Sequence, residues 1–316
     1  MKLLTFLKNW TLPVAIAVGT AAYLVFAHVP ALDEAGNQLG RLFDLAFPLF
    51  IFLTLFVTFA KVDFHLMRPQ RWHLWLALMQ LGLITLNVLA VLASSQHAQA
   101  RLTLEAALTC VIAPCASAAP VVVAKLHGNI HTMTTYTLLS SLLCSITIPI
   151  VFPMLEQVAG LTFLQAATLI LSRLATVMLL PLLLGWLVRH HVPTLYRYIL
   201  AHPDLGFYCW SVALAITTGI TVKNIAHAAA SPLLLAAIAA VSLLVCLMHF
   251  VLGRLVGRAE HEPINCGQGM FQKNTGMAIW IAYMYLNPVA SIGAGCYVLW
   301  QNIINSYEIW EQRAKN

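Results

Sequence analysis

A single lysine interrupts one of the apolar stretches of this chain, and polar groups surround it. Residues 267–276 read GQGMFQKNTG inside an apolar segment that covers residues 263–286. Apolar surroundings screen charge poorly, so the ammonium of Lys273 attracts an anion far more strongly there than in water. Asn274 and Thr275 add an amide and a hydroxyl at the same place. We therefore expect an anion-binding site with Lys273 as a fixed positive charge.

A second apolar segment is interrupted by two prolines. Residues 113–120 read APCASAAP, so Pro114 and Pro120 lie six positions apart near the middle of the segment. Proline removes a backbone donor and clashes with the preceding turn, so we expect a broken helix here, with an ordinary proline kink as the alternative. Ser117 and Ala118 lie inside the interruption and are candidates for contacting the same ligand.

Composition shows that these elements need lipid as their solvent. Of the 316 residues, 60% are hydrophobic and 9% are charged, and the mean hydropathy is +0.83. A soluble domain carries about 25% charged residues. This composition excludes a soluble enzyme, a disordered chain and a secreted disulfide scaffold. The seven cysteines lie in apolar stretches and form no CxxC pair, so we expect reduced packing residues.

Ten segments are long and apolar enough to span a membrane as helices. Their approximate ranges are 12–28, 43–60, 73–95, 103–125, 131–153, 163–188, 206–224, 232–257, 263–286 and 289–311. An even number of spans places both termini on the same side of the membrane. The segments on that side contain twelve Lys and Arg residues, and those on the other side contain three. This bias marks the cytoplasmic side. We expect a multi-pass protein of the cell inner (plasma) membrane with both termini cytoplasmic, and Trp210 as one of several interfacial anchors.

The net charge of +6 follows from the same bias of the cytoplasmic loops. It therefore predicts a lipid bilayer around the chain and no nucleic-acid partner.

The two interruptions fall at corresponding places in the two halves of the chain. Ser117 and Lys273 are 156 residues apart, close to half of the length. We expect two repeats of five helices, residues 1–157 and 158–316, which insert with opposite topology because five is odd. Unwound backbone must line a cavity or coordinate something in a membrane. Helices broken at matching places indicate the binding site of a secondary transporter.

Three stretches resemble motifs of the bile acid:sodium symporter family. Residues 58–66 (TFAKVDFHL) resemble its Thr-Leu-x3-Asp-Phe-x2-Leu signature. Residues 114–129 keep the proline-to-asparagine spacing of its Pro-Gly-Gly-Thr-x-Ser-Asn…Leu-Ala-Arg-Gly-Asn motif, and residues 273–278 (KNTGMA) resemble its Gln-Asn-Ser-Gly-Leu-Ala. With the number and order of the helices, the similarity extends over nearly the whole chain.

The resemblance implies ten helices in two domains. Counted in chain order, helices 1, 2, 6 and 7 would form a panel domain, and helices 3–5 and 8–10 a core domain. The broken helices 4 and 9 would cross in the core. An organic anion, either bile-acid-like or a small carboxylate such as a keto acid or a pantoate-like compound, would bind between the domains.

The residues that hold two sodium ions in this family are largely replaced here. The aligned positions hold Ala119, Pro120, Met133, Gly269 and Lys273. At two further aligned positions, Gln80 and Thr137 retain a side-chain oxygen of the kind that binds sodium in the family. Because sodium binds through oxygen atoms, we expect the usual sodium coupling to be lost and no cofactor or metal to be needed.

Lys273 is expected to stand where a sodium ion would. We expect its ammonium to donate to Gln80 and to exposed carbonyls, with Thr137 and Gln272 completing this cation-site substitute. Desolvation favours a neutral amine over an ammonium. The alternative is therefore a proton-coupled carrier in which Lys273 titrates.

Three further classes of function fit less well. Arsenite permeases of the same broad fold group place a cysteine at the position of Cys115, and a soft thiolate would suit arsenic; they also carry a glutamate in helix 9 that this chain lacks. A membrane enzyme would need an acid–base pair or a metal cluster. A channel would need charged rings or filter loops. The predicted spans hold none of these, so we expect a carrier and not an enzyme.

Overall fold

The computed structural model of the chain is all-helical. It describes residues 10–29, 33–61, 67–156, 160–202, 204–228 and 230–315, which form thirteen α-helices and no strand beyond one isolated bridge. The helices are α2 (Thr11–His28), α3 (Asp33–Ala60), α4 (Arg71–Ala93), α5 (Ala98–Ile112), α6 (Ala119–Lys125), α7 (Ile130–Leu155), α8 (Phe163–His191), α9 (Pro193–Ala201), α10 (Leu205–Ala226), α11 (Pro232–Ala259), α12 (Pro263–Phe271), α13 (Thr275–Tyr285) and α14 (Ser291–Lys315).

The long apolar segments of the sequence form the long helices. Five of them, α4, α7, α8, α10 and α11, are long and apolar enough to cross a membrane, and shorter apolar helical stretches cover Pro13–His28 and Leu49–Ala60. A helix satisfies its backbone hydrogen bonds internally, which lipid requires of any segment that spans it. The chain is an integral membrane protein with an all-α fold.

Two of the predicted segments are split, as their prolines and glycines indicate. The segment 103–125 forms α5 and α6, and the segment 263–286 forms α12 and α13. The structure also contains α9, a nine-residue helix between two predicted segments that begins with a proline at its first turn. The φ angle of proline is fixed at a helical value, which suits proline to the first turn of a helix.

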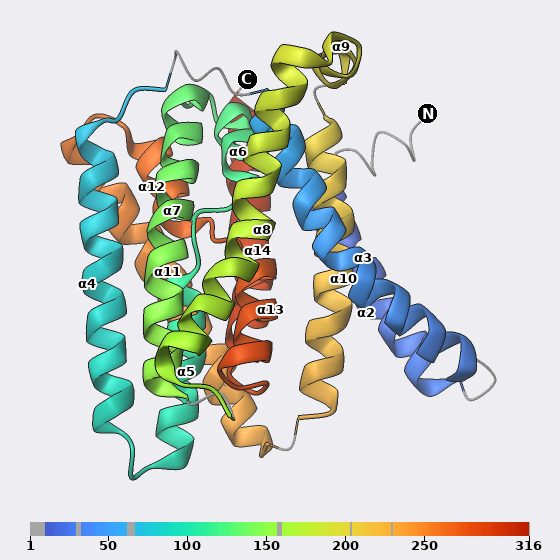
Figure 1. Cartoon of the computed structure of the whole chain (residues 1–316), viewed down its shortest axis with the longest axis vertical. Coiled ribbons are helices and arrows are strands. Elements are labelled where there is room, and N and C mark those ends of the chain that lie inside the picture. The colour runs from blue at the N-terminus through green and yellow to red at the C-terminus, as the bar shows by residue number, and fades with distance from the viewer. Residues whose placement is uncertain are drawn as a thin grey trace.

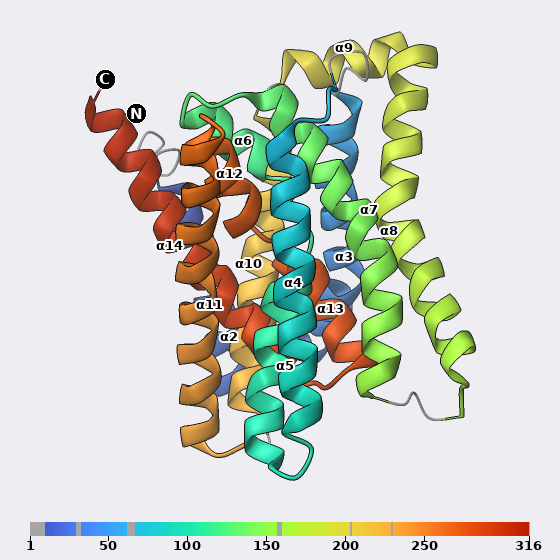
Figure 2. The same ribbon diagram turned by 90° about the vertical axis from the view of Figure 1, so that its left-hand side faces the viewer.

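The helices pack in two groups. In one, α10 contacts α2 and α3, and α3 contacts α8; in the other, α4, α5, α7 and α11 to α14 surround the two interruptions. Figure 1 shows α2, α3 and α10 on one side of the bundle and α4, α7 and α12 on the other. In Figure 2, the C-terminal end of α14 lies at the same end of the bundle as α6, α9 and α12.

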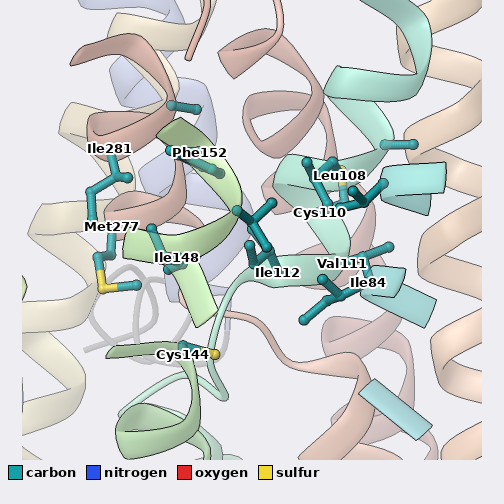
Figure 3. Packing of buried hydrophobic residues seen from close by; sticks show 14 of the residues in the cluster. Ile84, Leu108, Cys110, Val111, Ile112, Cys144, Ile148, Phe152, Met277 and Ile281 are labelled. Carbon is teal, nitrogen blue, oxygen red and sulfur yellow. The ribbon is translucent and has the colours of Figure 1, made fainter. Parts of the chain in front are cut away.

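The largest buried cluster joins the helices that border the interruptions. Figure 3 shows side chains of α5, α7 and α13 converging there, among them Ile112, Ile148 and Met277, each at most 1% exposed. Helices associate in lipid through close packing and not through exclusion of water. Gly293 of α14 permits such an approach, because a Cβ there would lie 2.3 Å from the carbonyl oxygen of Ala106 on α5.

Candidate functional site

Two non-helical segments meet inside the bundle. The first, residues 113–118, separates α5 from α6, and the second, residues 272–274, separates α12 from α13. These positions confirm the breaks predicted within the apolar segments 103–125 and 263–286. Each segment leaves backbone donors and acceptors that its own helix no longer satisfies.

The two segments satisfy each other as a short antiparallel bridge. The Ala116 amide donates to the Gln272 carbonyl at 2.8 Å, and the Asn274 amide donates to the Pro114 carbonyl at 2.8 Å. These two bonds pair Cys115 with Lys273. The interrupted helices therefore cross at their breaks, as the sequence predicted, and the bridge fixes Lys273 in place.

Side chains from three neighbouring helices support the remaining backbone groups. Ser140 of α7 accepts from the Cys115 amide at 2.9 Å. Gln301 of α14 accepts from the Lys273 amide at 3.0 Å and donates to the Lys273 carbonyl at 3.2 Å. Gln80 of α4 donates to the Ala113 carbonyl at 3.0 Å. All three are buried, so each bond lies where an unpaired backbone group would be costly.

A cavity opens beside the crossing. Of the residues that the sequence nominated for substrate contact, Ser117, Ala118, Asn274 and Thr275 line it, and so does Lys273. Within the described residues, the backbone amides of Ser117, Ala118 and Gly276 donate to no acceptor. This wall of the cavity therefore combines residues with free backbone amides, which suit an anion, with the buried Lys273.

The opposite wall comes from α3 and α10 and is mostly apolar. It comprises Ile51, Thr54, Trp210, Ala213, Leu214 and Thr217. Thr54 donates to the Phe50 carbonyl and Thr217 donates to the Ala213 carbonyl, both at 2.7 Å. Their hydroxyl protons are used within their own helices, so toward the cavity these groups offer acceptor oxygens.

The structure corrects the expected partners of Lys273. Its side chain is 1% exposed, and within the described residues its Nζ atom has no hydrogen-bond partner. Gln80 does not accept from it, since the Gln80 amide donates to Val111 and Ala113 carbonyls and its Oε1 atom has no partner there either. Both polar side-chain atoms of the buried Gln272 are likewise unpaired in the described structure.

Three other nominated positions lie behind the cavity wall and not on it. Thr137 is buried, donates to the Met133 carbonyl at 3.0 Å, and lies 3.7 Å from the Cys115 sulfur. Gln272 and Cys115 are also buried and do not line the cavity. The hydroxyl of Thr137 thus serves its own helix, a common role for threonine in a helix.

A second and larger space lies between α3 and α10 on one side and α6 and α7 on the other. Lys61, Lys125, His131 and Asp204 line it. Burial lowers the pKa of Lys61, and the Asp204 carboxylate opposes that shift. The Lys125 ammonium lies 3.8 Å from the centre of the Phe207 ring, a contact between the two groups of helices.

Sequence reasoning missed the apolar wall. Trp210 was expected only as an interfacial anchor, but it lines the cavity together with Thr54 and Thr217. The residues on this wall follow helical spacing along α3 and α10, which any buried helix face also shows. The signature stretch near residue 58 is described only in part, because residues 62–66 lie outside the described residues.

An all-α membrane bundle with two interrupted helices that cross beside a cavity defines a membrane transporter. The chain belongs to the sodium bile acid symporter family, whose model matches residues 47–228, more than half of the chain. That range includes the first interruption and ends before the second. No curated protein matches the chain.

Proposed function

We propose that the protein is a secondary transporter that moves an organic anion across the membrane by alternating access. The observation that carries the proposal is the cavity beside the crossing, which is lined by Lys273 and by residues with free backbone amides on one side and by an apolar wall on the other. Family membership supports transport as the activity. In this proposal the chain spans the plasma membrane ten times as two inverted repeats, residues 1–157 and 158–316, with both termini cytoplasmic.

The two packed groups of helices would act as the moving parts. The group of α2, α3, α8 and α10 would be the panel domain of the resemblance, and the remaining long helices and the two broken ones would be the core. The cavity takes lining residues from both groups, so a sliding or rocking movement between them would open it to one side and then the other. The larger space that Lys61 and Lys125 line would be its cytoplasmic entrance.

The wall chemistry supports an amphipathic anion as substrate. A carboxylate or sulfonate would meet Lys273, Ser117 and the free amides of the core, while the hydrocarbon part would meet Ile51, Leu214 and Trp210. Substrate hydroxyls would donate to Thr54 and Thr217. Bile-acid-like compounds and small carboxylates both meet this description.

Lys273 would replace a sodium ion in the transport cycle. A second cation about 4 Å from an ammonium would be repelled by about 4 kcal/mol at an effective dielectric of about 20. That energy corresponds to a loss of roughly a thousandfold in sodium affinity. The oxygen atoms left for sodium are few, because Ala119 and Pro120 supply no side-chain ligand.

The experiment measures uptake and melting temperature on the purified protein. Proteoliposomes are tested with taurocholate, pantoate and pyruvate, and thermal stability is measured in equimolar sodium, potassium and choline. We expect saturable uptake of at least one of these three probe anions and equal melting temperatures in the three salts. The variant Lys273→Gln should be less stable and should regain part of its stability at high sodium. Uptake of cationic solutes alone would refute the proposal, and a sodium-dependent rise in melting temperature of the unmutated protein would refute the replacement.

A second version of the function differs only in the coupling. The unpaired Nζ atom of Lys273 favours it, because an ammonium without an acceptor in a buried position has reason to release a proton. In this version an imposed pH gradient drives uptake of the probe anion. The arsenite alternative gains no support, because Cys115 does not line the cavity.

A further inference from the structure

The two spaces of the site follow each other along the same helices. The inner cavity beside the crossing and the larger space both take lining residues from α3, from the region of α6 and from α10. Those of the inner cavity fall within 51–54, 116–118 and 210–217, and those of the larger space within 57–61, 120–125 and 204–206. Because each pair of ranges adjoins along the chain, the larger space is the next compartment outside the cavity. We call it the entrance.

Three side chains connect the inner cavity with the entrance. Trp210 lines the cavity, and its ring centre lies 5.8 Å from that of Phe207 in an edge-to-face contact. The ammonium of Lys125, which lines the entrance, lies 3.8 Å from the centre of the Phe207 ring. Lys125 is the last residue of α6 and both rings belong to α10. This stack of side chains therefore also joins the two groups of helices.

The charges that line the entrance favour an anion. Lys61 and Lys125 contribute two ammonium groups, and among the described residues Asp204 contributes the one carboxylate. Asp204 acts electrostatically on Lys61. The face of a neutral ring attracts an ammonium less strongly than a carboxylate does, because a carboxylate adds a full charge and a hydrogen bond. An anion that reaches Lys125 can therefore take the place of the Phe207 ring.

The rest of the lining suits the hydrocarbon part of an amphipathic anion. Val57, Met67 and Val121 contribute apolar surface to the entrance. Thr134 donates its hydroxyl proton to the Ile130 carbonyl at 2.8 Å, so it offers an acceptor oxygen to a ligand. The entrance thus repeats the combination of a lysine with apolar side chains that lines the inner cavity.

We propose that the entrance is a second anion-binding site, in which Lys125 exchanges the Phe207 ring for the carboxylate or sulfonate of an organic anion. This inference rests on the proposed carrier function and identifies the first contact of its substrate at this end of the bundle. The exchange also breaks a contact between α6 and α10. Arrival of the anion would therefore loosen the two groups of helices at the place where they must separate in each cycle.

The first test observes the contact of Lys125 with Phe207 and needs no transport. The lysines of the purified protein are reductively methylated with ¹³C, which keeps their charge, and the Lys125 methyl resonance is assigned by its loss in Lys125→Arg. A group above a ring face is shielded by the ring current. We expect the Lys125 resonance upfield of the exposed Lys223 and expect Phe207→Leu to remove that shift.

A titration then tests the exchange. Taurocholate, pantoate and pyruvate are added in turn at constant ionic strength, and at least one should move the Lys125 resonance toward its position in Phe207→Leu. Chloride at the same concentration should leave it in place. A resonance without the upfield shift, no movement with any of the three anions, or an equal movement with chloride would overturn the proposal.

A third comparison separates the entrance from the inner cavity. Lys273→Gln removes the cation of the cavity, and Ser117→Val narrows the cavity and serves if the first variant does not fold. In either variant, the titration of Lys125 should persist with a Kd within about threefold of the unmutated value, because the two sites bind separately. If the response disappears in both variants, the Lys125 signal only follows binding in the cavity and the inference is wrong.

Uptake into proteoliposomes tests whether the entrance serves transport. At a probe concentration below KM, Lys125→Gln should lower the initial rate by about fivefold or more, because it removes a charge that attracts the anion. Lys125→Arg should stay within about twofold, since arginine keeps both the charge and the ring contact. Lys223→Gln is the matched control and should have no effect. An unchanged rate in Lys125→Gln would overturn the inference.

The outcomes distinguish this inference from the carrier proposal. If the unmutated protein transports none of the three anions but the Lys125 titration is intact, the carrier proposal fails and the entrance site stands. If uptake is saturable while Lys125 does not respond to the transported anion, the carrier proposal stands and the second site does not exist.

Discussion

The two interruptions occupy corresponding places in the chain, but they contribute different things to the site. The first, residues 113–118, is six residues long and mostly apolar, and its Pro114 supplies a carbonyl to the bridge. The second, residues 272–274, is three residues long and consists of Gln272, Lys273 and Asn274. Two backbone bonds join the interruptions to each other, whereas Gln272 and Lys273 hold unpaired side-chain atoms within the described structure. One break therefore supplies geometry, and the other supplies charge.

The largest effect is expected from removing that charge. Lys273→Met should raise the KM for the transported probe anion at least a hundredfold, because an ammonium about 4 Å from an anion contributes about 4 kcal/mol at an effective dielectric of about 20. Uptake kinetics in proteoliposomes measure this. The control is Arg173→Met, which removes an exposed cation of α8 and should leave KM within about twofold. A KM for Lys273→Met within threefold of the unmutated protein would show that the second break does not supply the charge.

The next effect concerns the support of the second break. Gln301→Leu removes both side-chain bonds to the Lys273 backbone and leaves a buried amide and a buried carbonyl without partners. We expect a loss of about 2–4 kcal/mol in the free energy of unfolding, measured by denaturation in detergent. The matched control is the neighbouring Asn302→Leu, since Asn302 donates only to the Val298 carbonyl of its own helix. Equal losses in both variants would mean that Gln301 contributes packing alone.

A smaller effect is expected at the first break. Ser140→Ala removes the acceptor of the Cys115 amide, and we expect a loss of about 1–2 kcal/mol in stability. Ser141→Ala is the control, because Ser141 donates to the Thr137 carbonyl of its own helix, and it should cost less than about 0.5 kcal/mol. If the two variants are equally stable, the first break does not depend on α7 for its shape.

The smallest effect is expected where the two groups of helices touch near the crossing. Thr58 of α3 donates to the Thr54 carbonyl at 2.7 Å and lies 3.4 Å from the Ser117 carbonyl. Because the first bond occupies its proton, Thr58→Val should change stability by less than about 0.5 kcal/mol. Uptake should stay within about twofold, as expected for surfaces that must separate in each cycle. A tenfold change in uptake would instead identify Thr58 as a latch between the groups.

The sequence alone determined that the chain needs a lipid environment, and it determined where the helices break. Long apolar runs cannot be soluble, and Pro114, Pro120 and the glycines around Lys273 disturb helices through their own backbone chemistry. These are local properties, so composition and spacing predict them. Family motifs and matching half-chain positions likewise indicated the crossing and four residues that line the cavity, Ser117, Ala118, Asn274 and Thr275.

Only the tertiary structure decided which polar atoms are paired. Gln80 lies 193 positions from Lys273 in the sequence, and whether it bonds a carbonyl of Ala113 or the ammonium depends on the packing of α4 against α5. The apolar wall of α3 and α10 and the buried His249–Tyr297 pair arise from contacts between distant helices in the same way. Sequence spacing specifies which residue is present at each position, but hydrogen-bond geometry acts over about 3 Å and depends on how the helices are finally placed.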